Sequence, residues 1–535
     1  MSNKNTLLNR LHALSLQLVF KPIIIASLGL LIVLKVNAQS ESTSIQYSPA
    51  FSAEELLELP RSGWLTNGGN LYNQRYSPLA QINRENIGSL KAVWRTHLNG
   101  SGLDPIYSGE GQPIVYDGVL YVATGEDDVF ALSLVDGEIL WSFEANLDPA
   151  IDVICCGWNN RGVAIGDGKV FVGLLDNRLI ALDQRTGEPV WSVQTERWEA
   201  GFSITSAPLY YNGLVITGYA GAEYGVRGRV KAFDASNGDL VWTFYTVPGP
   251  GEIGHGSWPQ DNEVWTKGGA TVWNTPAVDP ELNLLYFSTG NPGPDFNGGV
   301  RPGDNLFSDS VVAVDAMTGE YRWHFQQVHH DIWDYDASNP VVLFDVEIEG
   351  ETHKGLAQVN KTGWVYILDR ITGEPLIGIE ERPVPQESRQ ATSPTQPYPI
   401  GDAVIPQHLD MAVEGFPLVN QGRIFTPFYG DQSVIVNPGP GGGANWPPSS
   451  YDPERQTLFV CATENPGSYQ GGDTDYELAE EGELFTGGPF GSAGVTTRGI
   501  IAAMDMSTNT IKWRYRWQDR CYSGTWSLLA AMTDV

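Results

Sequence analysis

The stretch ALSLVDGEILW at residues 131–141 recurs along the chain and decides the fold. Apolar residues are followed by a polar residue, usually Asp, then by a short turn that usually contains Gly, and finally by an apolar pair and Trp. Each copy predicts a strand, a tight turn and a second strand, because Asp caps the turn and Gly adopts a positive φ. The later copies are ALDQRTGEPVW at 181–191, AFDASNGDLVW at 232–242, AVDAMTGEYRW at 313–323, and two weaker ones, ILDRITGEPLI at 367–377 and AMDMSTNTIKW at 503–513.

The spacing of the tryptophans gives the length of the repeating unit. Trp94 fits the end of an earlier copy, and the steps from it to Trp242 are 47, 50 and 51 residues, followed by one of 81. A repeat of roughly fifty residues is typical of one β-propeller blade, and the longer step indicates an insertion. Further strands are predicted at 168–173 and 284–288. One blade cannot bury both of its faces, so we expect the blades to close into an all-β propeller rather than a β-sandwich.

The composition fits this architecture and limits the partners. The chain has 535 residues, with 17 Trp, 60 Gly and only 18% charged residues, which excludes a disordered chain or a coiled coil. Its formal net charge is −31. A field of this sign repels nucleic acid and anionic membrane surfaces. It favours either a basic electron-transfer partner or simply solubility in a salty environment, and both explanations stay open.

Residues 1–38 have the pattern of a secretory signal peptide. Positive charge at Lys4, Arg10 and Lys21 is combined with an apolar run at 23–34, and Val-Asn-Ala at 36–38 resembles a cleavage site. The run is short for a membrane span, so we expect cleavage rather than an uncleaved anchor, and a mature domain at 39–535 in the periplasm. Export permits disulfides. No Cys-x-x-Cys-His is present, which excludes a covalent c-type haem in this chain.

The repeat resembles the tryptophan-docking motif of the quinoprotein alcohol dehydrogenases. Five further segments resemble the motifs that form this family's active site: CCGWNNRG at 155–162, GAEYGVRG at 221–228, TVW at 271–273 with STGNP at 288–292, HDIWDYD at 330–336, and NKTG at 360–363. The resemblance is collinear from about Trp64 to Ser523. It implies an eight-bladed propeller that oxidises an alcohol with pyrroloquinoline quinone (PQQ) and a metal ion, and passes electrons to a soluble cytochrome c.

The same resemblance implies a set of cofactor-binding residues. Cys155 and Cys156 match adjacent cysteines that form a disulfide lid over the quinone, although two free thiols are the alternative. Trp273 matches the indole on which the other face of the quinone stacks. Arg161 matches a cation that pairs with a PQQ carboxylate, and Lys361 one that binds the reactive oxygens. The remaining implied PQQ contacts are Glu110, Thr205, Gly221, Ala222, Thr271, Asn445 and Trp446.

The resemblance also implies a metal site and a catalytic base. Glu223 and Asn291 match metal ligands, and Asp334 matches both a ligand and the base that takes the hydroxyl proton of the alcohol. Oxygen ligands suit a hard cation. That cation would polarise the quinone carbonyl that receives hydride. Asp304 is interpreted as a structural turn residue. The pair His329-His330 does not predict zinc, because no third ligand follows at a suitable spacing.

Asp336 leaves the identity of the metal open. An aspartate two residues after the base resembles the lanthanide-dependent methanol dehydrogenases, in which an extra carboxylate suits a trivalent ion. The form His329-His330-Asp-x-Trp-Asp-x-Asp also resembles quinoprotein sugar dehydrogenases, which use calcium or magnesium. We expect Asp336 to be a fourth metal ligand, with calcium as the ion and a lanthanide as the alternative, while an Asp that only caps a turn is the structural alternative.

The end of the chain departs from the family pattern. Cys521-Tyr-Ser-Gly is expected to lead into further blade strands, but the chain ends at Val535, so we expect a propeller truncated at its C-terminus. The competing hypothesis is a non-enzymatic scaffold propeller of the kind that assists outer-membrane assembly. A scaffold does not require the implied site residues together, and this favours the enzyme.

Overall fold

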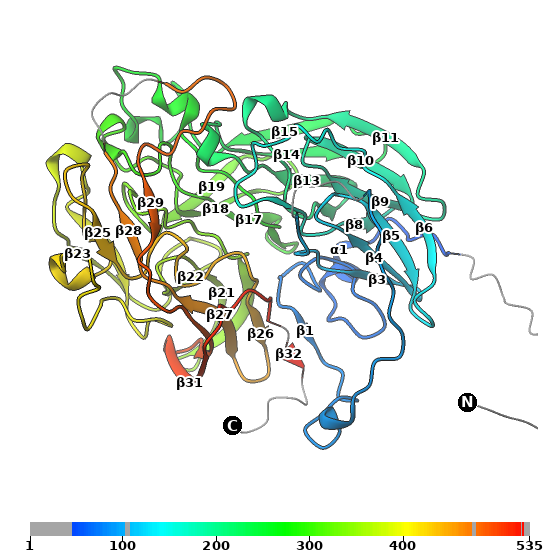
Figure 1. The fold of residues 1–535 in the computed structure, drawn as a ribbon. Helices are drawn as coiled ribbons and strands as arrows, with labels where there is room; N and C mark the ends of the chain where they lie inside the picture. Colours follow the sequence, from blue (N-terminus) through cyan, green and yellow to red (C-terminus); the bar gives the residue numbers. More distant parts are fainter. Residues whose placement is uncertain (1–44, 102–106, 473–477, 526, 529–535) are drawn as a thin grey trace, which may run out of the picture. The chain divides into compact units, whose positions relative to one another are not determined.

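The structure is a computed structural model that describes residues 45–101, 107–472, 478–525 and 527–528. The predicted signal peptide and its cleavage site lie outside the described residues. Nearly all regular structure is strand (Figure 1). Short helical elements are α1 (Ala53–Leu57) and the 3-10 turns η1 (Ile87–Ser89), η2 (Trp198–Ala200), η3 (Ala222–Tyr224), η4 (His255–Ser257), η5 (Val264–Lys267), η6 (Gly298–Val300), η7 (Ser388–Gln390) and η8 (Val419–Gly422). No described helix is long and apolar enough to cross a membrane.

Most of the described strands form antiparallel sheets of up to four strands, and most pairings join strands that follow one another in sequence. The four-stranded sheets are β3 (Ile114–Tyr116), β4 (Val119–Ala123), β5 (Val129–Ser133) and β6 (Ile139–Phe143); β8 (Ala164–Gly166), β9 (Lys169–Gly173), β10 (Arg178–Asp183) and β11 (Pro189–Gln194); β12 (Leu209–Tyr211), β13 (Leu214–Gly218), β14 (Arg229–Asp234) and β15 (Leu240–Tyr245); β16 (Ala277–Asp279), β17 (Leu284–Ser288), β18 (Ser310–Asp315) and β19 (Tyr321–Gln326); and β26 (Ser450–Asp452), β27 (Thr457–Glu464), β30 (Arg498–Asp505) and β31 (Thr510–Trp517). This confirms the all-β prediction.

Smaller sheets complete the described fold. They are β20 (Val342–Ile348) with β21 (Glu351–Val359) and β22 (Val365–Asp369); β25 (Val434–Val436) with β28 (Gly467–Tyr469) and β29 (Phe490–Ser492); β23 (Ile379–Pro383) with β24 (Thr395–Pro399); and the parallel pairs β1 (Tyr76–Ser77) with β32 (Ser527–Leu528) and β2 (Tyr107–Ser108) with β7 (Trp158–Asn159). The pair β1–β32 joins segments from the two ends of the described chain (Figure 1).

The repeat predicted the hairpins of the four-stranded sheets. In the copy at 181–191, Asp183 Oδ1 accepts hydrogen bonds from the backbone N–H groups of Arg185 and Thr186 at 2.9 and 3.0 Å, as expected for a capped turn. Gly187 has a φ of 74°, and Asn509, which replaces Gly in the last copy, has a φ of 55°. The prediction made from the weaker copy at 367–377 was only partly right, because the strand after its turn, β23, pairs with β24 and not with β22.

Five docking tryptophans pack on the turn of the next copy of the repeat: Trp94, Trp141, Trp191, Trp242 and Trp323. A Cβ atom at Gly187 would lie 2.6 Å from the Trp141 ring, and one at Gly238 would lie 2.9 Å from that of Trp191. The Trp141 indole N–H also donates to the Gln184 carbonyl at 3.0 Å. Glycine is therefore required by the contact as well as by its φ. These contacts confirm the prediction that tryptophans pack between neighbouring sheets.

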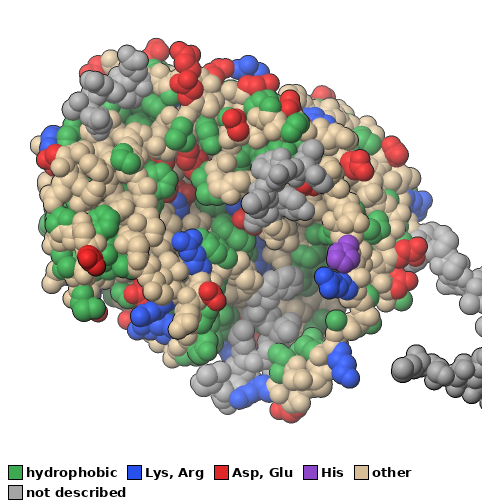
Figure 2. All heavy atoms as spheres, viewed as in Figure 1, with side chains coloured by type: hydrophobic (Ala, Val, Ile, Leu, Met, Phe, Trp, Pro, Cys, Tyr) green, Lys and Arg blue, Asp and Glu red, His purple; other side chains and the backbone are tan. Residues whose placement is uncertain are grey.

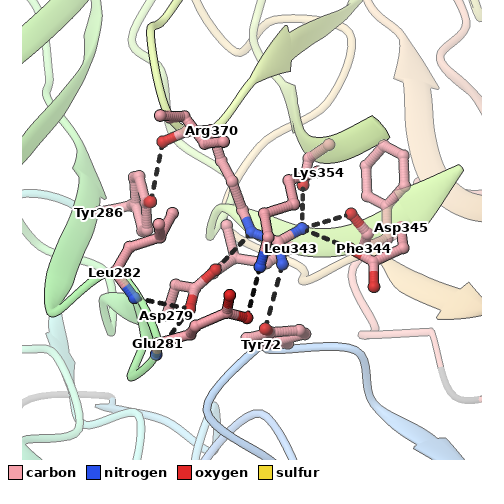
Figure 3. Close-up of polar contacts among 12 residues, drawn as sticks. Tyr72, Asp279, Glu281, Leu282, Tyr286, Leu343, Phe344, Asp345, Lys354 and Arg370 are labelled. Carbon is pink, nitrogen blue, oxygen red and sulfur yellow. Dashed lines mark hydrogen bonds and ion pairs between the residues drawn. The ribbon is translucent and has the colours of Figure 1, made fainter. Parts of the chain in front are cut away.

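A buried charge network joins the sheet of β16–β19 to the sheet of β20–β22 (Figure 3). Arg370 is 0% exposed and donates from Nε to Asp279 Oδ2 at 2.7 Å. Its Nη1 donates to Asp345 Oδ1 at 2.9 Å, and its Nη2 to the Tyr72 hydroxyl at 3.1 Å. Nearby, Lys354 pairs with the exposed Glu281 at 2.6 Å. A guanidinium shared by several acceptors stays charged when buried.

The cysteines pair in a way that the sequence did not predict. Cys461 in β27 and Cys521 beyond β31 form a disulfide across 60 residues. The predicted export would permit such a bond, but a pairing between distant cysteines follows only from the fold. On the face shown in Figure 2, acidic and basic side chains are intermixed and do not form a patch of one sign.

Candidate active site

Arg161 is the centre of a first cluster of predicted cofactor residues. Its Nη2 pairs with Glu110 Oε2 at 2.8 Å, and its Nη1 donates to Thr205 Oγ1 at 3.0 Å. Its guanidinium carbon lies 4.9 Å from the centre of the Trp273 ring and 5.8 Å from that of Trp446. Residues from five separate segments thus meet around one cation. A guanidinium beside flat aromatic faces suits a planar, negatively charged ligand.

Lys361 is the centre of a second cluster. Its Nζ donates to Asp334 Oδ1 at 2.6 Å and lies 3.4 Å from Asp336 Oδ2. The Asn291 backbone N–H donates to Asp336 Oδ1 at 2.6 Å. Burial lowers the pKa of Lys361, but Asp334, Asp336 and Glu223 outweigh burial and raise this pKa well above its usual value. Lys361 is therefore charged in this site.

The backbone around this cluster is fixed by close contacts. Asp334 has a φ of 63°, a region that Asp and Asn tolerate better than most residues. A Cβ atom at Gly290 would lie 3.3 Å from both Asp336 Oδ1 and Thr271 Oγ1, so both side chains lie close to Gly290. The backbone carbonyl of Lys361 accepts a hydrogen bond from the Gly443 N–H at 2.7 Å.

Glu223 lies in η3, directly after Gly221 and Ala222. Gly221 has a φ of 119°, which starts this tight turn. Burial raises the pKa of Glu223, and the charge of Asp336 raises it further, while Lys361 opposes both. The Glu223 carbonyl accepts from the Phe485 N–H at 2.6 Å. The three-residue turn therefore carries the predicted ligand into the same electrostatic field as the Lys361 cluster.

The two adjacent cysteines are not bonded to each other in the structure. Their Sγ atoms lie 2.9 Å apart, and both residues are exposed. The hydrogen bond from Cys155 lowers the pKa of Cys156 to about 7, and the charge of Lys361 acts in the same direction. A bond between neighbours requires a strained ring, and the thiols are close enough to form it. The predicted lid therefore stays a prediction.

Asn445 is the predicted residue that the structure joins least to the rest. Its side chain bonds within its own turn, donating to the Gly441 carbonyl at 3.0 Å and accepting from the Trp446 N–H at 2.7 Å.

Asp304 is exposed, and its carbonyl accepts from Gln326 Nε2 at 2.7 Å. Both ring nitrogens of the buried His330 lie 2.6 Å from backbone carbonyls, those of Gly303 and Gln390.

Sequence reasoning missed Asp295. This carboxylate is 3% exposed, and its Oδ1 has no hydrogen-bond partner. Burial raises its pKa well above the usual value, and the charges of Glu223 and Asp336 raise it further. It follows Asn291 by four residues in the same Gly- and Pro-rich segment. That closeness was the available signal, but an Asp beside Pro usually indicates only a turn.

The donors in this region fit a hard cation. The predicted ligands Glu223, Asn291, Asp334 and Asp336 can each coordinate a cation through a side-chain oxygen atom. With Asp295 they place four carboxylates in the field of one lysine, an excess of buried negative charge that a cation would offset. Among the described residues, however, no three His, Cys, Asp or Glu side chains converge on one point, and Lys361 pairs with both aspartates.

Comparison with known proteins places the chain in a family. The model of the glucose/ethanol/alcohol dehydrogenase β-propeller domain, a PQQ family, matches residues 64–483. The chain belongs to this family. The predicted resemblance is confirmed, and so is the propeller class of the fold, since the four-stranded antiparallel sheets agree with it.

Individual relatives of the PQQ propeller family are named as quinoprotein or quinohemoprotein alcohol dehydrogenases. The chain is 34% identical over 473 residues to the quinohemoprotein alcohol dehydrogenase ADH IIB of Pseudomonas putida, covering 85% of this chain and 63% of the relative. It is 38% identical to ADH-IIG of the same species, covering 75% and 54%. The quinoprotein alcohol dehydrogenase PedH, also of P. putida, is 33% identical, covering 87% and 77%. The chain thus spans less than two thirds of the first two relatives.

Two solved structures of the PQQ propeller family superpose well on the chain. The quinohemoprotein alcohol dehydrogenase of Comamonas testosteroni has a TM-score of 0.73 at 29% identity, covering 87% of this chain and 68% of that one. A europium-containing methanol dehydrogenase has a TM-score of 0.75 at 28% identity, covering 89% and 82%. The second of these proteins thus contains europium, a lanthanide.

Proposed function

We propose that the protein oxidises an alcohol with bound PQQ and a metal ion. The observation that carries the proposal is the Lys361 cluster, in which a buried lysine holds Asp334 at 2.6 Å beside Asp336. The names of the relatives support the same activity. The proposal includes an eight-bladed propeller, export to the periplasm and transfer of electrons to a soluble cytochrome c. These parts rest on the sequence features described above.

The residues of the chain have distinct roles in this proposal. PQQ, when bound, supplies the two-electron oxidant. Arg161 and Thr205 bind one of its carboxylates, and the Trp273 ring supports one of its faces. Asp334 accepts the proton of the substrate hydroxyl. Burial raises the pKa of Asp334 well above its usual value, as suits a group that takes up a proton, and the charge of Lys361 opposes this effect. Glu223 and Asn291, with the two aspartates, would hold the metal.

Reconstitution tests the proposed function directly. The purified protein is mixed with PQQ and calcium, and the reduction of an artificial dye is followed with a panel that runs from short alcohols to polyols and polymeric alcohols. We expect dye reduction that depends on PQQ, on the metal and on at least one alcohol. A protein that folds, fails to bind PQQ and reduces no dye would instead support the scaffold hypothesis.

The identity of the metal gives a second prediction. Metal-free protein is loaded with PQQ and with either calcium or lanthanum, as wild type and as Asp336→Ala. We expect calcium to support dye reduction in the wild type. A lanthanide site needs the third carboxylate to balance a trivalent ion, and a calcium site does not. Activity only with lanthanum, lost in Asp336→Ala, would contradict calcium. Activity with calcium that survives in Asp336→Ala would exclude the lanthanide.

The adjacent cysteines give a third prediction. Because Cys156 has a lowered pKa and lies 2.9 Å from Cys155, we expect the pair to oxidise to a disulfide in the exported protein. Mass spectrometry of the non-reduced peptide that contains both residues should show a loss of two hydrogens. The Cys461–Cys521 peptides serve as the control for intact oxidation. Free thiols at 155 and 156 in freshly isolated active protein would contradict the prediction.

A further inference from the structure

A cavity of about 190 Å³ adjoins the Arg161 cluster. Glu110, Arg161 and Trp446, all predicted cofactor residues, line it on one side. Arg75, which directly precedes β1, lines it as well, together with Gly524, shortly before β32 (Figure 1). The cavity therefore lies where segments from both ends of the described chain meet the proposed cofactor site.

Arg75 is a buried cation in the lining of this cavity, and no carboxylate pairs with it. It is 1% exposed, and it takes part in none of the ion pairs among the described residues. Its Nη1 donates to the Asn73 carbonyl and its Nη2 to Asn67 Oδ1, both at 3.1 Å, while its Nε has no partner. Burial lowers its pKa to about 9, which still leaves the guanidinium charged at neutral pH. A buried charge without a counter-ion is costly, so a ligand anion would be strongly favoured.

The charges around the cavity do not balance. Among its lining residues only Arg75, Arg161 and Glu110 carry charge, and Glu110 already pairs with Arg161 at 2.8 Å. One positive charge, that of Arg75, is left over. Asn67 links the two arginines, because its Nδ2 donates to the Arg161 carbonyl at 2.9 Å while its Oδ1 accepts from Arg75. The extra charge is therefore held in place by the same segment that supports the cofactor cluster.

We propose that this cavity is a carboxylate-binding site in which Arg75 neutralises the ligand. A carboxylate suits a guanidinium because its two oxygens match two N–H donors in one plane. The carboxylate belongs either to bound PQQ, in which case the site rests on the proposed function, or to a small free acid. The experiment distinguishes these two sources.

Titration calorimetry of the apoprotein with sodium acetate tests the site. Acetamide has the shape of acetate without its charge and serves as the matched ligand control. We expect wild type to bind acetate and not acetamide. Arg75→Gln should weaken acetate binding by about 10- to 100-fold, the loss typical of a hydrogen bond to a charged group, and Arg75→Lys should retain part of the affinity. Circular dichroism checks that the variants are folded.

The wild-type titration keeps the proposal open to refutation even if a variant does not fold. No acetate binding by wild type, equal binding of acetamide, or unchanged acetate affinity in folded Arg75→Gln would each overturn it. The same titration after loading with PQQ identifies the source. A PQQ carboxylate is the ligand if PQQ abolishes acetate binding and Arg75→Gln weakens PQQ binding, measured by quenching of tryptophan fluorescence. A free acid is the ligand if acetate still binds.

The two proposals fail in different ways. If wild type binds acetate through Arg75 but neither binds PQQ nor reduces dye, the carboxylate site stands and the proposed function is wrong. If wild type binds PQQ and oxidises alcohols but shows no acetate binding, the proposed function stands and the Arg75 site is wrong.

Discussion

Asp334→Asn is expected to lower the turnover of alcohol oxidation by about 100-fold or more, the range for losing a general base. Asparagine has the size of aspartate, tolerates the φ of 63° at this position, and keeps an oxygen that accepts from Lys361. The fold should therefore remain, and the loss should appear in kcat. The measurement is steady-state dye reduction by the PQQ-loaded protein, with circular dichroism and PQQ binding as checks on folding and loading.

Asp304→Asn is the matched control for this substitution. Asp304 is exposed, and its backbone carbonyl, which the change does not alter, accepts hydrogen bonds from Gln326 and His330. We expect turnover close to that of the wild type. If Asp304→Asn proved severe and Asp334→Asn mild, Asp334 would not be the base.

Asp279→Asn is expected to lower the free energy of unfolding by about 3–5 kcal/mol, the usual cost of breaking a buried ion pair from one side. Asp279 and Arg370 are both 0% exposed, and the change removes the charge that Arg370 Nε contacts at 2.7 Å (Figure 3). The remaining carboxylate partner, Asp345, is largely exposed and compensates weakly. Urea unfolding followed by tryptophan fluorescence gives the measurement.

Glu281→Gln is the control within the same network. Glu281 pairs with Lys354 at 2.6 Å, but its side chain is 73% exposed. Solvent screens such a pair, so the free energy of unfolding should change by less than about 1 kcal/mol. Equal destabilisation by both variants would show that burial of the Arg370 pair is not what makes it important.

The repeat predicted the fold from local signals. The Asp and Gly positions fix each turn, and the pairing of Ala181 with Trp191 follows from the length of that turn. The strand pairing of the copy at 367–377 was harder to predict. Ile377 stands where the other copies have Trp, and β23 pairs with a competing strand, β24. The disulfide between Cys461 and Cys521 depends on contacts between sheets, which no local pattern reports.

The site residues could be predicted only where a motif marked them. Arg161 and Lys361 lie in distinctive segments, and the structure places each at the centre of a cluster. Arg75 and Asp295 lie in ordinary turn sequences, and nothing local indicates that their charges are buried. Their importance depends on what long-range folding brings around them: Asn67 and the cavity for Arg75, Glu223 and Asp336 for Asp295.

The contacts of the docking tryptophans have a direction. Trp141 belongs to β6 but covers the turn at Gly187, and Trp191 belongs to β11 but covers the turn at Gly238. The energy of such an array is a sum of terms between adjacent members. A sheet that loses its turn therefore exposes the indole of the sheet before it in sequence, while the sheet after it keeps its own turn. Local opening then spreads in one direction along the chain: a damaged sheet first loosens the sheet that precedes it in sequence.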